Sequence, residues 1–109
     1  MKQLKRSECA VLPLVLKGKW YDMIDSGEKR EEYRDDKRYW NTRVSRWYKE
    51  GMAKVHHVVA FSRGYVKPTM FFRVDTLVRV PHRINHPEWG EPTSSHWVIC
   101  LGERVELVD

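Results

Sequence analysis

Apolar and polar positions divide the chain into short segments that predict a mixture of strands and helices. An almost continuous apolar run at Val11–Leu16 predicts a strand buried on both faces, and Pro13 within it favours the edge of a sheet. Residues 1–8 show no periodicity and are expected to be a frayed terminus. Further strands are predicted at Lys54–Ser62, Met70–Val80 and Trp97–Leu101, the last continuing past Gly102 through Arg104–Val108.

Two helices are predicted between these strands. The first is Trp20–Ser26, and Gly27 closes it because glycine tolerates the left-handed conformation. Asp35 and Asp36 are N-cap candidates for a second helix at Lys37–Glu50, which Gly51 is expected to end. Each helix has an apolar stripe that is expected to face the core. In the first helix the stripe consists of Trp20, Met23 and Ile24, and in the second it consists of Trp40, Val44, Trp47 and Tyr48.

Two segments carry more specific expectations. The second helix is basic outside its stripe, through Lys37, Arg38, Arg43, Arg46 and Lys49; such a side is usually only solvated, but interleaved aromatic and cationic residues also suit single-stranded nucleic acid. In the strand at 70–80, alternation assigns one face to the core, namely Met70, Phe72, Val74, Thr76, Val78 and Val80. The connection at 81–95 is irregular and of a length at which loops are often functional.

A charged strand beginning at Arg30 is the strongest candidate site. Alternation puts Glu32 and Arg34 on one face, and Lys29 joins them if the turn at Gly27 rotates the start of the strand. Together they would bind an anionic or hydrogen-bonding ligand. Two structural alternatives remain open, which are an internal Glu32–Arg34 ion pair and an edge strand that is charged against aggregation.

This segment resembles the signature of the ASCH domain family, which is related to PUA RNA-binding domains. Gly27, Lys29, Glu32 and Arg34 spell its G-x-K-x-x-E-x-R motif. Further similarity, to small stand-alone ASCH proteins of bacteria and their mobile elements, lies in the apolar strand before the helix, Tyr39-Trp40, Arg63-Gly64-Tyr65, Pro87-Glu88-Trp89-Gly90 and Trp97 to Gly102. The resemblance implies an α+β fold with a PUA-like small β-barrel flanked by two or more helices, and a cleft lined by the signature strand.

Length and composition narrow the possibilities. The 109 residues suit a single domain, 1–109, with one core. A formal charge of +5 favours an anionic partner. Cys9 and Cys100 lack the spacing of a disulfide framework or a thiolate metal site. Neither a signal peptide nor an apolar run of membrane-spanning length is recognisable, so a cytoplasmic protein is expected.

The first functional hypothesis is a module that binds RNA, single-stranded nucleic acid or a nucleotide, without a cofactor. Edge hydrogen bonds and aromatic stacking would both contribute to base recognition. The candidate ligand-binding residues are Lys29, Glu32, Arg34, Trp40, Arg63, Tyr65, Glu88 and Trp89.

The second hypothesis is a small hydrolase. Some small ASCH relatives remove an acyl group from a modified cytidine, and by resemblance Lys29 matches their catalytic lysine, with Glu32 or Glu88 moving protons. The chain departs from that pattern, because Glu32 stands where it has Thr, and its distant Glu aligns with either Glu88 or Glu91. No metal site is expected, since the prolines flanking His82 and His86 disfavour a helix that carries both.

Overall fold

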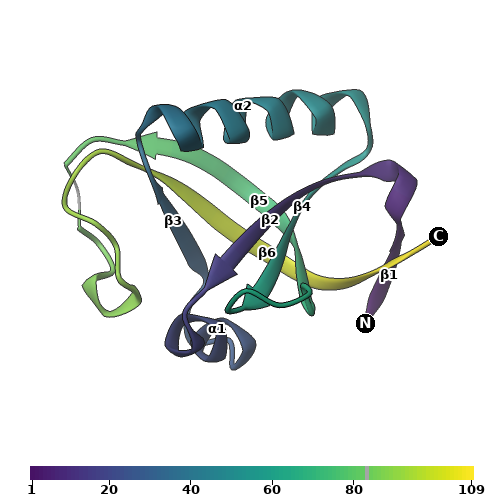
Figure 1. Ribbon diagram of the computed structural model, residues 1–109, viewed down its shortest axis with the longest axis horizontal. Coiled ribbons are helices and arrows are strands. Elements are labelled where there is room, and N and C mark those ends of the chain that lie inside the picture. The colour runs from purple at the N-terminus through teal and green to yellow at the C-terminus, as the bar shows by residue number, and fades with distance from the viewer. Residues whose placement is uncertain (83) are drawn as a thin grey trace.

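The computed structural model describes residues 1–82 and 84–109, so Arg83 in the predicted connection at 81–95 lies outside the described residues. Strands lie before, between and after two α-helices in an α+β fold, as predicted (Figure 1). In chain order they are β1 (Lys2–Lys5), the 3-10 turn η1 (Arg6–Glu8), β2 (Cys9–Leu16), α1 (Gly18–Asp25), β3 (Glu31–Asp35), α2 (Arg38–Ala53), β4 (His56–Arg63), β5 (Met70–Val80), the 3-10 turn η2 (Pro87–Trp89) and β6 (His96–Val108).

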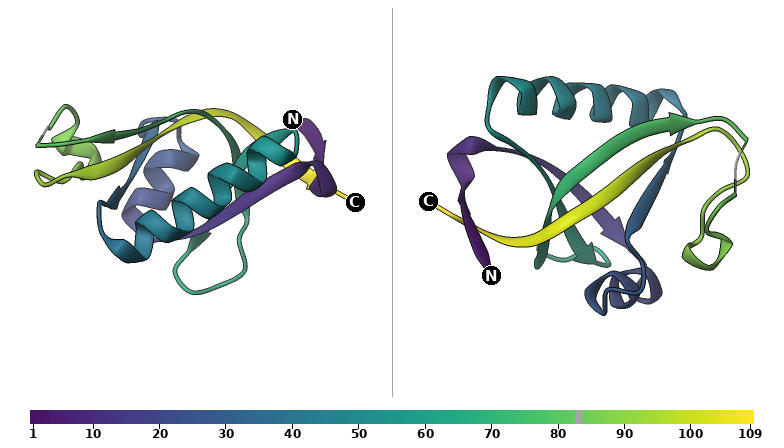
Figure 2. Two further views of the ribbon diagram at one scale, coloured as in Figure 1. Left: turned by 90° about the horizontal axis from the view of Figure 1, so that it is seen from above. Right: turned by 180° about the vertical axis from the view of Figure 1, so that it is seen from behind.

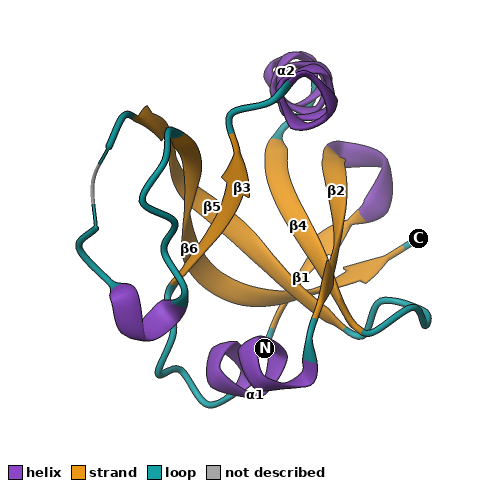
Figure 3. Ribbon diagram, turned by 60° about the vertical axis from the view of Figure 1, so that its left-hand side comes forward, coloured by secondary structure: helices purple, strands orange, loops and turns teal. Residues whose placement is uncertain are grey.

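The strands form one mixed sheet in the order β1-β6-β5-β4-β2. β6 is long enough to pair with β3 along 96–100 and with β1 along 105–108. β1 and β2 lie at the two ends of this path, and no ladder joins β2 to β3 in the described part of the chain. The sheet is therefore curved but not closed, with α1 and α2 near opposite ends of its strands (Figure 3).

The main core is formed by buried residues of the strands β2, β4, β5 and β6 together with those of α1 and α2. Val44 and Trp47 of the predicted stripe are buried in it, whereas Trp40 is half-buried and Tyr48 is exposed. Trp47 Nε1 donates to the carbonyl of Ala10 at 3.0 Å and to that of Val58 at 3.1 Å, so its one polar atom is satisfied by both strands. The helix is thereby fixed over the β2–β4 pair.

The start of the chain differs from the prediction of a frayed terminus. Lys2–Lys5 runs parallel to the end of β6, which brings both termini to the same side of the molecule (Figures 1 and 2). Leu4 is 5% exposed and belongs to a second core cluster with Cys9, Val58 and Val105. One buried leucine in a strand of four residues is too weak a pattern to predict from sequence.

Two strands have different buried faces from those predicted. β2 ends the sheet, as Pro13 suggested, but Pro13 and Val15 are exposed, so only one of its faces is buried. In β5, register shifts between Phe72 and Thr76 break the alternation, so that Leu77 packs against the main core and Val78 is 38% exposed.

The helix boundaries were predicted to within a few residues. Gly27 follows α1 with a φ of +85°, which confirms its role in ending that helix. Lys37, rather than Asp35 or Asp36, is the N-cap of α2, and it makes no side-chain capping bond. Gly51 lies within α2 instead of ending it. A Cβ at this position would be 2.2 Å from His57 Nε2, so the packing of that ring leaves room only for glycine. Neither helix of the described residues is long and apolar enough to cross a membrane.

Candidate functional site

The signature segment places three charged side chains in contact, as the sequence predicted. The turn at Gly27 is fixed by a bond from the Lys29 backbone N–H to the Met23 carbonyl, 3.0 Å long. Lys29 Nζ lies 3.2 Å from Glu32 Oε1, and Arg34 Nη1 lies 2.5 Å from Glu32 Oε2. Glu32, itself 4% exposed, thus binds one cation with each oxygen.

Lys29 is enclosed rather than open to a cleft. Its side chain is 1% exposed, and Nζ also donates to the backbone carbonyl of Trp89 at 2.5 Å. The amine lies 4.8 Å from the ring centroid of Trp20 and 4.7 Å from that of Tyr33. Burial lowers the pKa of Lys29, and the neighbouring Glu32 carboxylate opposes that shift. The ammonium therefore links the signature strand to the loop that carries Trp89.

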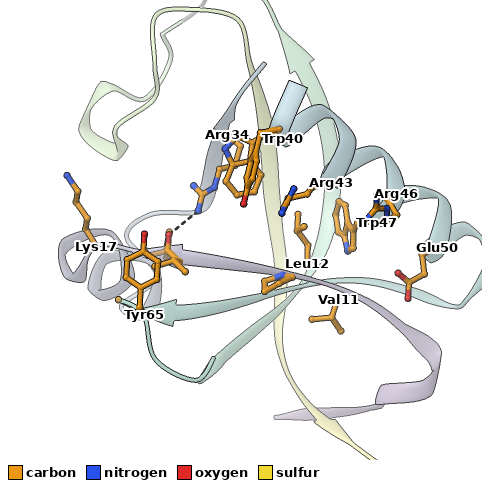
Figure 4. Close-up of a pocket in the computed structure, with 15 residues that line it drawn as sticks. Val11, Leu12, Lys17, Arg34, Trp40, Arg43, Arg46, Trp47, Glu50 and Tyr65 are labelled. Atoms are coloured by element: carbon orange, nitrogen blue, oxygen red, sulfur yellow. Dashed lines mark hydrogen bonds between the residues drawn. The ribbon is translucent and has the colours of Figure 1, made fainter. Parts of the chain in front are cut away.

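Arg34 connects this buried cluster to the surface. Its guanidinium lies 5.0 Å from the ring centroid of Trp40, and Nη2 donates to the Val15 carbonyl at 3.2 Å. The second bond, drawn dashed in Figure 4, runs from β3 to β2, where no ladder joins the two strands. Arg34 thus bridges the open side of the sheet and borders the space between β2 and α2.

That space is a groove of about 900 Å³. The edge strand β2 lines one side with apolar groups that include Val11, Pro13 and Val15, and α2 lines the other (Figure 4). The polar and aromatic side chains that line it are Lys17, Arg34, Tyr39, Trp40, Arg43, Arg46, Trp47, Glu50 and Tyr65. In Figure 4, Lys17 and Tyr65 lie toward one end of the groove and Glu50 toward the other.

The groove carries an excess of positive charge. Within residues 1–82 and 84–109, Lys17, Arg43 and Arg46 form no ion pair with a carboxylate, and Arg43 lies 3.8 Å from the ring centroid of Tyr39. Glu50, the acidic residue of the lining, pairs with Lys54 at 3.0 Å. An anion in the groove would meet cations whose charge no protein carboxylate has neutralised.

The predicted site residues fall into three places. Arg34, Trp40 and Tyr65 line the groove, whereas Lys29 and Glu32 lie buried beside it. The structure does not bring the other three to the groove. Arg63 pairs with Asp22 at 3.2 Å, Glu88 pairs with His86 at 3.0 Å, and Trp89 stacks on His86 with ring centroids 3.9 Å apart.

Four residues of α2 that line the groove beside Trp40 were not among the predicted site residues. Tyr39, Arg43, Arg46 and Glu50 recur at i, i+4, i+7 and i+11, which places them on one face beside the buried stripe. The basic side of this helix was recognised in the sequence. Sorting its residues onto helix faces by this spacing would have identified the four groove residues. Lys17 gave no such signal, because only the fold brings the end of β2 to the groove.

The loop that covers Lys29 is held by a second buried acid. Glu91 Oε1 accepts from the backbone N–H groups of Asn85 and His86 at 2.7 and 2.9 Å, and Oε2 lies 2.9 Å from His96 Nε2. The side chains of Glu91 and His96 are both 0% exposed. Glu91 therefore fixes the loop on β6, a structural role that the sequence did not indicate.

No group of three or more His, Cys, Asp or Glu side chains is placed to hold a metal ion in the described part of the chain.

Comparisons with family models, curated proteins and solved structures found no match.

Proposed function

We propose that this protein binds RNA, single-stranded nucleic acid or a nucleotide in the groove between β2 and α2. The observation that carries the proposal is the row of cations Lys17, Arg43 and Arg46, which have no carboxylate partner among the described residues and lie among exposed aromatic rings. Phosphates are attracted to such a row, and bases stack on rings such as Tyr39 and Tyr65.

We further propose that the chain is an ASCH protein with a PUA-like fold. The G-x-K-x-x-E-x-R motif supports the assignment, because Glu32 contacts both Lys29 and Arg34, so the three charges form one cluster and are not scattered over a charged edge strand. The bond from Arg34 to Val15 supports a barrel-like arrangement, since it spans the side of the sheet that pairing leaves open.

Binding to short fluorescent oligonucleotides, measured at several salt concentrations, tests the function. Arg43→Gln/Arg46→Gln should weaken binding and reduce the salt dependence, by about 1.4 in the slope of log K against log salt for a single strand. Arg38→Gln/Lys49→Gln removes the same charge from α2 outside the groove lining and is the matched control. The proposal fails if no oligonucleotide binds at low salt, or if both double variants lose affinity equally.

The hydrolase is a second candidate because of one observation, the burial that lowers the pKa of Lys29. A lowered pKa makes a lysine easier to deprotonate, and the free amine is the form that acts as a nucleophile or base. Substrate would first have to displace the Trp89 carbonyl, which covers Nζ. In a panel of acylated nucleosides, turnover should vanish in Lys29→Met and persist in Lys19→Ala, a lysine that also lies over Trp20. Turnover that survives Lys29→Met would remove this lysine from the mechanism.

A further inference from the structure

We infer that the groove binds a run of about three to five nucleotides of one unpaired strand, with its phosphates along α2 and its bases over β2. This inference rests on the proposed function and chooses among the ligands that it leaves open. According to this inference, the groove fits such a strand better than it fits a single nucleotide, a duplex or an acidic peptide.

The length of the groove sets the size of the ligand. The stretch of β2 from Val11 to Leu16 spans roughly 16 Å at about 3.3 Å per residue. On the opposite wall, α2 from Tyr39 to Glu50 also spans about 16 Å at about 1.5 Å per residue. At about 3.4 Å per nucleotide a stacked strand would place about five nucleotides in this length, and a more extended strand fewer.

The cations are distributed along the groove and do not converge on one point. Lys17 lies at the end near Tyr65, Arg34 and Arg43 lie between, and Arg46 lies toward Glu50 (Figure 4). A single phosphate group is best bound by donors that point at one position. Charges spaced along a wall instead match the repeated charge of a polyanion.

The opposite wall favours bases that are free of a complementary strand. Val11, Pro13 and Val15 of β2 present apolar surface, and the ring of Tyr65, next to the end of β2, is 95% exposed. The ring of Tyr39, on the α2 side, is 56% exposed. Only an unpaired strand can turn its bases toward such a surface while its phosphates contact Arg43 and Arg46, because a duplex presents its backbone outward. An acidic peptide would gain from the cations but has no base to stack on the rings.

A length series of oligonucleotides tests the inference. Binding of the full chain to oligo(U) and oligo(dT) of one to eight nucleotides should tighten by about fivefold or more per added nucleotide, up to a length of about four, and then level off. Arg46→Gln should lower the salt slope of the tetramer by about 0.7, whereas Lys49→Gln should leave it unchanged. Arg46 and Lys49 are both exposed, so neither substitution should unfold the protein, and a thermal melt of each variant checks this.

Three outcomes would overturn the inference. The first two leave the proposed function in place, and the third replaces it. A mononucleotide that binds as tightly as the tetramer means a single-nucleotide pocket, and a duplex that binds as tightly means recognition of the backbone alone. An oligoglutamate peptide that displaces the tetramer at equal concentration means a groove for acidic peptides. If no nucleic acid of any length binds at low salt, the proposed function itself is wrong.

Discussion

At the scale of single residues, Glu32 is the group on which the signature cluster depends. It contacts Lys29 through one oxygen and Arg34 through the other, and all three belong to the strand and turn after α1. Lys29 in turn binds the Trp89 carbonyl, and Arg34 binds the Val15 carbonyl. The carboxylate therefore connects the loop at one side of the molecule to the groove at the other.

Removing this carboxylate should destabilise the fold strongly. Glu32→Gln leaves the buried Lys29 without a countercharge, and breaking a buried pair by removing one partner costs about 3–5 kcal/mol. Chemical denaturation measures the loss in free energy of unfolding. Glu103→Gln is the matched control, because Glu103 also contacts two cations, Arg73 at 2.8 Å and Lys2 at 3.7 Å, but at an exposed site. A loss no larger than that of the control would show that the cluster does not stabilise the fold.

Glu91 makes stability depend on acid pH. Burial acts to raise its pKa, but the hydrogen bonds from His96 and the amides of His86 and Asn85 outweigh burial and hold the pKa below its ordinary value of 4.5. A depressed folded-state pKa stabilises the protein above that ordinary value, and the contribution is lost as pH falls through the folded pKa.

Wild type and Glu91→Gln should therefore differ most at neutral pH. The difference in free energy of unfolding should be constant down to about pH 5 and should shrink below that, since protonated Glu91 resembles the amide. Denaturation curves collected across this range measure it, and a difference that stays constant into the acid range would contradict the assignment.

At the scale of elements, the sequence predicted what local patterns determine. The end of α1 at Gly27, the burial of Val44 and Trp47 in the stripe of α2 and the position of β2 at an edge each follow from a few neighbouring residues. The errors occurred where a distant segment decides. β5 changes its buried face because its pairing with β6 slips near Asp75, where Gly102 has no Cβ to obstruct the carboxylate. Gly51 lies inside α2 at a place where the ring of His57, on another element, leaves no room for a Cβ.

The last case can be tested by filling that space. Alanine in place of glycine inside a helix usually stabilises it by about 1 kcal/mol. Gly51→Ala should instead destabilise the protein by about 1–3 kcal/mol, because the new Cβ would overlap the His57 ring. In a His57→Ala background the same substitution should become neutral or stabilising. Guanidinium denaturation of the wild type, the two single variants and the double variant gives the coupling free energy between positions 51 and 57. A coupling of zero would show that the ring moves aside freely.

At the scale of the whole molecule, both the groove and the closure of the chain come from segments far apart in sequence. β2, α2 and Tyr65 form the groove, and none of them is adjacent to another along the chain. The motif at Gly27–Arg34 was visible because its residues are neighbours, but only Arg34 of its charged cluster lines the groove. Local patterns therefore identified the charged cluster of the strand and not the groove beside it.

The pairing of β1 with β6 yields the last prediction, because it joins the two ends of the chain. Leu4→Ala removes a side chain buried against Val58 and Val105, which should lower the free energy of unfolding by about 2–5 kcal/mol. Lys5→Ala, at an exposed position of the same strand, is the control. Since tryptophans lie in other elements, a shift of the transition followed by tryptophan fluorescence would show that β1 unfolds together with the core. A frayed terminus would give no shift, and the amides of residues 105–108 would then exchange rapidly in the wild type as well.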